Sequence, residues 1–206
     1  MPARPIRAIL YDYGNVLVGW SPRNLYARLI AKRERLEYFL DKVCPISWHL
    51  RHDSGEPMSV TIPERQRLFP DFAEEIAAWK TGFADMMTGE ITGTTQLVEA
   101  LHSAGIPQFV LTNMPNEMVE TCFAPFDFPK YFQDVIVSGD EKAAKPGRAI
   151  FDITLTRMGN LDPCEVLFTD DSDANIAAAH DLGFVTHLFE GPEGLRAKML
   201  ALGLPI

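Results

Sequence analysis

The chain has few residues that could crosslink it or bind a soft metal. Only three of its 206 residues are cysteines, Cys44, Cys122 and Cys164, and they form neither a CxxC pair nor another metal-ligand spacing. Disulfide frameworks and thiolate metal sites need closely patterned cysteines, so the sequence favours neither. This cysteine usage is typical of a reduced protein, and we expect a cytoplasmic location.

Basic residues are also scarce. The chain contains 19 lysines and arginines against 28 aspartates and glutamates, which gives a formal net charge of -9. Nucleic acids and anionic membranes bind to basic faces, so we expect neither as a partner. A small anionic substrate remains compatible with this charge, because one metal ion and a few lysines can reverse the local field.

Long hydrophobic runs, internal repeats and low-complexity segments are missing as well. The first apolar run ends at Asp12 and is too short and too acidic for a signal peptide or a transmembrane helix. Apolar residues still make up 47% of the chain. That is enough for one large domain, or for a core domain with an insert.

The most informative segment is the apolar run over 8–11, which ends in Asp12 and is followed at once by Gly14 and Asn15. A buried parallel strand places an acid in this way at the carboxyl edge of a sheet. A carboxylate there can bind a metal or attack phosphorus as a nucleophile. Taken alone, Asp12 could equally be the cap of a turn or a helix.

From about residue 93, short apolar runs alternate with segments of helical periodicity. The runs predict strands over 109–111, 134–137, 166–168 and 184–186, in addition to the first strand. This alternation is typical of an α/β fold with a Rossmann-like parallel sheet and helices on both faces.

The segment between the first strand and this alternating region is mostly helical in its periodicity. We therefore expect a core domain formed by 1–18 and 90–206, with an inserted α-helical cap over 19–89. The polar segment Arg51–Pro57 predicts a loop within the cap, and Pro63 predicts a first helical turn.

Further helix starts are predicted from capping residues. Asp71 is expected to cap the next helix of the insert. Thr94 or Thr95 is expected to cap the first helix after the insert, and Pro146 to open a later one.

Polar residues follow four of the predicted strands: Asp12, Thr112-Asn113, Lys145 and Asp170-Asp171. The carboxyl ends of parallel strands meet at one edge, so these residues should converge. Carboxylates with a backbone carbonyl suit Mg²⁺, and a threonine with free backbone N–H groups can hold phosphate oxygens. Each signal alone has a simpler explanation in turn chemistry, helix capping or a solvated lysine.

Four segments together resemble the motifs of haloacid dehalogenase (HAD) superfamily hydrolases, in the same order. They are Tyr11–Leu17, Leu111–Asn113, Lys145-Pro146 and Phe168–Asn175. The segment Trp48–Ser59 is similar to the cap of the subgroup whose first motif reads Asp-Leu-Gly-Asn-Val-Leu. That subgroup includes sugar-phosphatase-like and 2-haloacid dehalogenase-like proteins.

The resemblance implies a role for each matching catalytic residue. Asp12 would be the nucleophile, forming an aspartyl-phosphate that water then hydrolyses. Thr112 and Asn113 would bind the transferring phosphoryl group, and Lys145 would steady that group and Asp12. The cap would select the substrate.

The resemblance also implies a Mg²⁺ site. Asp12 and the backbone carbonyl of Gly14 would be ligands, Asp171 would touch the metal directly, and Asp170 would act through water. Adjacent carboxylates repel one another unless a cation lies between them, which independently favours a metal at Asp170 and Asp171.

The chain departs from the family pattern at Gly14. Family phosphatases usually carry a second aspartate there as general acid and base, a role that contributes roughly 10²–10⁴ in rate. Sugar 1-phosphates or acyl phosphates, whose leaving groups depart easily, would suffer least from its loss. His49, His52 and Asp53 of the cap are candidates for a replacement.

Three functions compete. The first is a Mg²⁺-dependent phosphatase acting on a small phosphorylated metabolite, as a monomer or homodimer. The second is a metal-independent 2-haloacid dehalogenase, whose fourth motif typically reads Ser-Asn where this chain has Asp170-Asp171. The third is a catalytically weak HAD-like module that binds a phosphometabolite or a protein, for which Gly14 is the only support.

Overall fold

A computed structural model describes residues 4–206; residues 1–3, which belong to the expected core range 1–18, lie outside the described residues. The strands are β1 (Ala8–Tyr11), β2 (Val18–Trp20), β3 (Met87–Glu90), β4 (Gln108–Thr112), β5 (Asp134–Val137), β6 (Val166–Asp170) and β7 (Val185–Leu188). Five of them form a parallel sheet in the order β5-β4-β1-β6-β7. The other two, β2 and β3, pair as an antiparallel ribbon.

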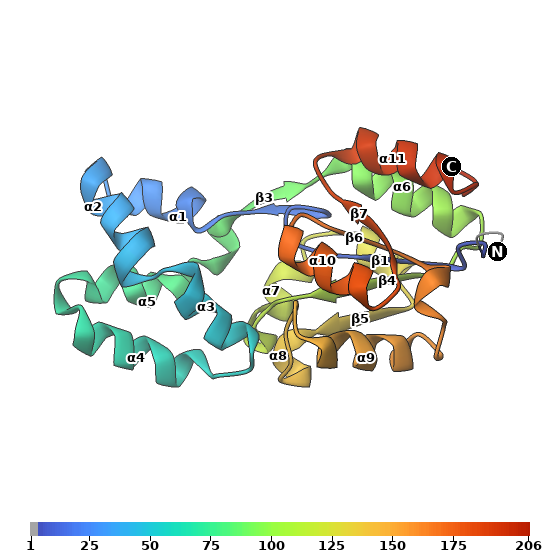
Figure 1. Ribbon diagram of the computed structural model, residues 1–206. Coiled ribbons are helices and arrows are strands. Elements are labelled where there is room, and N and C mark those ends of the chain that lie inside the picture. Colours follow the sequence, from blue (N-terminus) through green and yellow to red (C-terminus); the bar gives the residue numbers. More distant parts are fainter. Residues whose placement is uncertain (1–3) are drawn as a thin grey trace.

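The helices fall into a cap group and a core group. The cap helices are α1 (Pro22–Leu29), α2 (Arg33–Tyr38), α3 (Ile46–Asp53), α4 (Met58–Leu68) and α5 (Ala73–Thr81). The core helices are α6 (Thr92–Ser103), α7 (Val119–Phe123), α8 (Ser138–Glu141), α9 (Arg148–Arg157), α10 (Asp173–Asp181) and α11 (Pro192–Ala201). Figure 1 shows the two groups as separate lobes joined by the β2–β3 ribbon.

The central strand β1 is buried on both faces, as its unbroken apolar sequence predicts. Its side chains alternate, since successive residues of a strand point to opposite faces. Ile9 and Tyr11 belong to an apolar layer shared with α6 and α11, and Ala8 and Leu10 to one shared with α9 and α10. The predicted α/β fold with helices on both faces is confirmed.

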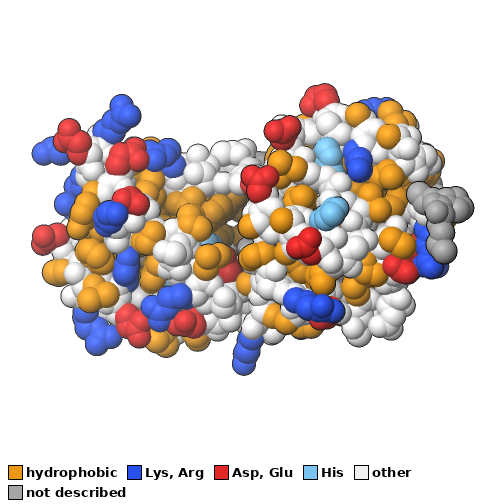
Figure 2. All heavy atoms as spheres, in the orientation of Figure 1, with side chains coloured by type: hydrophobic (Ala, Val, Ile, Leu, Met, Phe, Trp, Pro, Cys, Tyr) orange, Lys and Arg blue, Asp and Glu red, His pale blue; other side chains and the backbone are white. Residues whose placement is uncertain are grey.

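The cap has its own apolar interior, built mainly from aromatic side chains. Trp79 is fully buried, with its ring centroid 5.3 Å from that of Trp48 and 5.7 Å from that of Tyr26. This interior is continuous with the apolar layer on the α6 side of the sheet. On the face seen in Figure 2, acidic and basic side chains are interspersed over the cap. None of the described helices is long and apolar enough to cross a membrane.

The expected domain boundaries, after residues 18 and 89, fall inside the ribbon strands β2 and β3. The sequence did not predict this ribbon, because its strands are short and carry glycines at Gly19 and Gly89. The division into core and cap units stays a prediction.

Two expectations about the cap helices are wrong. The segment Arg51–Pro57 is not all loop, because α3 continues to Asp53. Burial of His52 and Asp53 at its end favours the helix over the polar sequence signal. Pro63 lies in the interior of α4 rather than in its first turn, since the helix begins at Met58, which is fully buried.

Three predicted helix starts are also displaced. Asp71 lies in a short 3₁₀ turn, and the residue before α5 is Phe72, without a side-chain cap. The helix α6 starts at Thr92, so Thr94 and Thr95 lie inside it and are buried. Pro146 precedes α9 by two residues, because the helix begins at Arg148.

Candidate functional site

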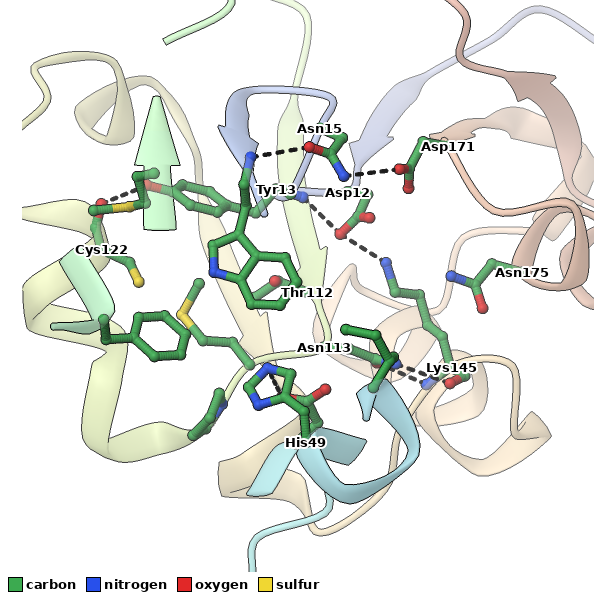
Figure 3. A pocket seen from close by; sticks show the side chains of 18 residues that line it. Asp12, Tyr13, Asn15, His49, Thr112, Asn113, Cys122, Lys145, Asp171 and Asn175 are labelled. Carbon is green, nitrogen blue, oxygen red and sulfur yellow. Dashed lines mark hydrogen bonds and ion pairs between the residues drawn. The ribbon is translucent and has the colours of Figure 1, made fainter. Parts of the chain in front are cut away.

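The carboxyl edge of the parallel sheet brings the predicted polar residues together. Asp12 directly follows β1, and its backbone N–H donates to the carbonyl of Thr169 on the neighbouring strand β6 (2.9 Å). Thr112 and Asp170 are the last residues of β4 and β6. Because all three strands run in the same direction, these side chains meet at one edge, where Lys145 joins them. Figure 3 shows Asp12, Thr112 and Lys145 at this edge.

Lys145 is the electrostatic centre of the site. Its side chain is 1% exposed, and its Nζ atom lies 2.8 Å from Oδ1 of Asp12 and 2.7 Å from Oδ2 of Asp170. The same nitrogen donates to the carbonyl oxygen of Leu111 (2.8 Å). Burial alone would lower the pKa of Lys145, but the two carboxylates outweigh it and raise this pKa, so the ammonium stays charged.

The carboxylate of Asp12 is held in one orientation. Its Oδ1 atom accepts a hydrogen bond from the N–H of Tyr13 (2.7 Å) and pairs with Lys145. Burial raises the pKa of Asp12, and the adjacent ammonium of Lys145 opposes that rise. The geometry therefore presents a buried carboxylate whose charged form is favoured by its lysine partner and opposed by burial.

The side chain of Asn113 fixes the loop that carries Lys145. Its Nδ2 donates to the carbonyl of Lys145, and the N–H of Lys145 donates to its Oδ1, both at 2.9 Å. Because both ends of the amide are used in this way, the side chain of Asn113 is fully engaged with the backbone of Lys145. Thr112 lines the same cavity and is 2% exposed.

Three carboxylates meet at the predicted metal site. Asp12, Asp170 and Asp171 each offer one oxygen, and these oxygens lie within 4.8 Å of one another. Hard oxygen donors at this spacing fit Mg²⁺, which binds through one or two carboxylates and completes its shell with water and substrate oxygens. Gly14, expected to add its carbonyl, lines the same cavity.

The two neighbouring aspartates differ in their surroundings. Asp170 is fully buried, and its oxygens accept from Lys145, from the N–H of Ser172 (2.9 Å) and from Asn175 (3.0 Å). Asp171 is exposed and is held by the side-chain amide of Asn15 (3.1 Å). Asp171 is thus the more accessible of the pair, while Asp170 holds its neighbours in place.

Sequence reasoning gave no role to two residues of the site, Asn15 and Asn175. Asn15 takes a left-handed backbone conformation (φ 56°), and its Oδ1 accepts the N–H of Trp20 (2.9 Å). Both asparagines lie inside quoted motif segments, but the sequence does not show which carboxylate each one contacts. Their positions depend on the tertiary fold.

The cap closes the other side of a cavity of about 190 Å³. The cap and ribbon residues that line it are Trp20, Ile46, His49, Asp53, Phe83 and Met87. Within residues 4–206, Lys145 is the one lysine or arginine in its lining. The cap and ribbon side of the cavity is therefore mostly apolar, and the described residues place no lysine or arginine on it.

His49 and Asp53 lie one turn apart on α3 and both face this cavity, whereas His52 does not line it. Nε2 of His49 is 3.4 Å from Oδ1 of Asp53. Burial lowers the pKa of His49 to about 3, so its ring is neutral. Burial, reinforced by the charge of Asp12, raises the pKa of Asp53 to about 7.

Comparison with known proteins identifies related sequences. Residues 6–183 match a family model described as haloacid dehalogenase-like hydrolase. A phosphorylated carbohydrates phosphatase of Thermotoga maritima is 26% identical over 97% of this chain and 95% of its own length. A phosphoglycolate phosphatase of Salmonella paratyphi A is 33% identical over 41% of this chain, a match that spans about a third (33%) of that relative's length.

Solved structures show the same fold at low identity. A predicted HAD-like family hydrolase from Porphyromonas gingivalis has a TM-score of 0.74 at 20% identity, covering 97% of this chain and 98% of the other. A HAD family enzyme from Bacteroides thetaiotaomicron, in complex with magnesium and inorganic phosphate, has a TM-score of 0.66 at 22% identity (90% and 95% covered). An L-2-haloacid dehalogenase from Xanthobacter autotrophicus has a TM-score of 0.61 at 20% identity (97% and 84% covered).

Proposed function

The chain belongs to the haloacid dehalogenase-like hydrolase family, and from that premise we propose that it is a Mg²⁺-dependent phosphatase acting on a small phosphorylated metabolite. The observation that carries this proposal is the pairing of one lysine with two carboxylates. Lys145 lies within 2.8 Å of both Asp12 and Asp170, and Asp171 stands beside them. This arrangement combines an oriented nucleophile with an acidic metal site.

In the proposed reaction, a carboxylate oxygen of Asp12 attacks phosphorus while the bond from phosphorus to the leaving oxygen breaks. The leaving oxygen takes up a proton and departs as an alcohol. Water then attacks the phosphorus of the aspartyl-phosphate, which releases inorganic phosphate and restores the carboxylate of Asp12. Lys145 keeps Asp12 in line throughout and offsets the negative charge of the phosphoryl group.

The remaining residues complete the site. Thr112, through its hydroxyl, and Asn113, through its backbone N–H, would hold the phosphoryl oxygens. Asp12, Asp171 and the carbonyl of Gly14 would hold Mg²⁺, with Asp170 acting through water. When bound, the ion would neutralise charge on the phosphoryl oxygens and reduce repulsion between substrate and carboxylates.

The composition of the cavity restricts the substrate. Among residues 4–206, the one cation that lines it is Lys145, which is already paired with two carboxylates, so a second anionic group on the substrate would have no partner there. The apolar wall instead suits a leaving group without charge. We therefore infer a phosphate ester of an uncharged alcohol, and expect phosphoglycolate to be a poor substrate.

Phosphate release from a panel of sugar phosphates, nucleotides, phosphoglycolate and p-nitrophenyl phosphate, with Mg²⁺ and with EDTA, tests the function. We expect Mg²⁺-dependent release that the Asp12→Asn variant loses, because an amide oxygen is a poor nucleophile. Turnover retained by that variant would contradict the role of Asp12. Halide release from a 2-haloacid in the presence of EDTA would instead identify a dehalogenase, and no turnover of either class would favour a binding module.

A further inference from the structure

The last turn of α3 places one carboxyl group of the cap in the reaction cavity. Asp53 lines the cavity, together with Asp12 and Lys145 of the core. The turn after it packs directly on the core, because a Cβ at Gly55 would come within 2.9 Å of the carbonyl oxygen of Gly139. Gly55 also has φ 92°, a conformation that favours glycine. The docking of this turn fixes Asp53 over the carboxyl edge of the sheet.

The carboxyl group of Asp53 is buried, yet its Oδ1 atom forms no hydrogen bond that would stabilise the described part of the fold. Its side chain is 4% exposed, and Oδ1 has no hydrogen-bond partner in the described part of the chain. An unsatisfied buried polar atom costs about 1–3 kcal/mol, and such a cost persists where function requires the group. The raised pKa of Asp53 means that a large fraction of this carboxyl carries a proton at neutral pH.

The neighbouring histidine is held so that it faces Asp53 with a donor. The indole N–H of Trp79 donates to Nδ1 of His49 (3.2 Å), and an indole nitrogen can only donate. The proton of the neutral imidazole of His49 is therefore on Nε2, the atom 3.4 Å from Oδ1 of Asp53. The donor nitrogen of His49 thus lies beside Oδ1 of Asp53 without forming a hydrogen bond to it, so this carboxyl oxygen stays free to exchange a proton.

Asp53 also lines this cavity without a role in the proposed reaction as described so far. In the described part of the chain, three aspartates line the cavity: Asp12, the proposed nucleophile; Asp171, at the proposed metal site; and Asp53. Gly14 stands where related phosphatases usually carry their general acid and base. The cap side supplies the remaining carboxyl group of the cavity, Asp53, as a proton donor for the leaving oxygen.

We propose that Asp53 is the general acid and base of this enzyme, supplied by the cap in place of the residue missing at Gly14. This inference rests on the proposed phosphatase function. Protonated Asp53 gives its proton to the leaving oxygen as the phosphorus–oxygen bond breaks. The resulting carboxylate then takes a proton from the water that attacks the aspartyl-phosphate, which returns Asp53 to its starting state.

Two esters with aromatic leaving groups of similar shape test this role in the Asp53→Asn variant with Mg²⁺. Benzyl phosphate releases an alkoxide that needs a proton, whereas p-nitrophenyl phosphate releases a stable phenolate. We expect turnover of benzyl phosphate to fall by roughly 10²–10⁴. In stopped-flow measurements, p-nitrophenyl phosphate should still give a fast burst of one phenolate per enzyme, followed by slow turnover, because only the water step lacks its base.

A rescue variant separates proton transfer from a structural effect. Apart from the adjoining residues, a Cβ at Gly14 would meet no heavy atom of residues 4–206 within 4 Å, so a side chain can begin there without a clash. Gly14→Asp in the Asp53→Asn background should restore much of the lost benzyl phosphate turnover. Asp71→Asn, a change at an exposed cap aspartate, serves as the matched control and should behave like wild type.

The outcomes distinguish this inference from the function on which it rests. Equal loss on both esters without a burst or a rescue, or no loss on either, would overturn the role of Asp53 while leaving the phosphatase intact. If the wild-type enzyme hydrolyses p-nitrophenyl phosphate but not benzyl phosphate, the role of Asp53 as general acid would be overturned as well. Wild-type enzyme that releases phosphate from neither ester would overturn the phosphatase function itself.

Discussion

The side chain of Asn113 binds the backbone of Lys145 through two hydrogen bonds of 2.9 Å, one to the carbonyl oxygen and one from the N–H. The ammonium of Lys145 in turn pairs with Asp12 and Asp170 and donates to the carbonyl of Leu111, so it connects the carboxyl ends of β1, β6 and β4. The contacts of the candidate site therefore also stabilise the carboxyl edge of the sheet.

Removing that ammonium should destabilise the protein. Lys145→Met keeps the length of the side chain but leaves two buried carboxylates without their counter-ion, and loss of one partner of a buried pair costs about 3–5 kcal/mol. Urea denaturation without Mg²⁺ should show a decrease in the free energy of unfolding of this order. Arg148→Met, at an exposed pair with Asp152, should change it by less than about 1 kcal/mol. Equal stability of the two variants would contradict the buried network.

Asn15 should control metal affinity although it need not touch the metal. Its amide holds Asp171 (3.1 Å), and loss of such an outer contact typically weakens metal binding by about 10–100-fold. Asn15→Gly removes the amide and suits the left-handed backbone at this position. The Mg²⁺ concentration for half-maximal activity should rise by that factor.

Two further variants serve as references for the Mg²⁺ titration, one with a larger expected effect and one with none. Asp171→Ala should raise the requirement further than Asn15→Gly, because it removes a proposed ligand itself. Asp181→Ala, at an exposed position at the end of α10, the helix that follows Asp171, should leave the titration unchanged. An Asn15→Gly titration that coincides with wild type would rule out the contact to Asp171 as a determinant of affinity.

His52 should make the cap sensitive to acid. Its Nε2 lies 2.6 Å from Oγ1 of Thr61, and burial lowers the pKa of His52 from the ordinary 6.5 to about 4. Between these two values the unfolded chain binds a proton that the folded chain excludes. The free energy of unfolding should therefore decrease as the pH falls from about 6.5 to 4, and be fully recovered above 6.5.

Urea denaturation across this pH range can isolate the contribution of His52. His52→Gln should show a shallower decrease than wild type, while His49 remains in both proteins. His180→Gln changes an exposed histidine and should run parallel to wild type. Parallel curves for wild type and His52→Gln would show that His52 is not excluded from protonation in the folded state.

The sequence predicted the core of this protein well because its signals are local and redundant. The strands β1, β4 and β6 are buried and mostly apolar, and the polar residues at their ends must meet once the strands are parallel. The order of the motifs then indicated the family. The convergence of Asp12, Lys145 and Asp170 required no information beyond these elements.

Other features depend on contacts that the sequence does not encode locally. The β2–β3 ribbon has little apolar alternation, and the last turn of α3 is polar in sequence yet buried against the core. Asn15 and Asn175 each contact an aspartate from a position that only the fold defines. The candidate role of Asp53 also needed the structure, because the sequence could not distinguish it from His49 and His52.

The single variant Gly14→Asp, which adds an acid to the core, should be faster than wild type only on substrates for which protonation of the leaving group limits the rate. Gly14 has room for a side chain, since a Cβ there has no neighbour within 4 Å among the described residues, and its φ lies outside the left-handed region. In Gly14→Asp the new carboxyl would add to Asp53 instead of replacing it. For esters with poor leaving groups we therefore expect a gain well below the roughly 10²–10⁴ of a full acid–base contribution. For p-nitrophenyl phosphate we expect no gain in the burst rate.

The Gly14→Ala variant controls for the altered backbone in this experiment. If Gly14→Asp is slower than Gly14→Ala on every ester, the second carboxylate beside Asp12 harms the nucleophile more than it helps the leaving group.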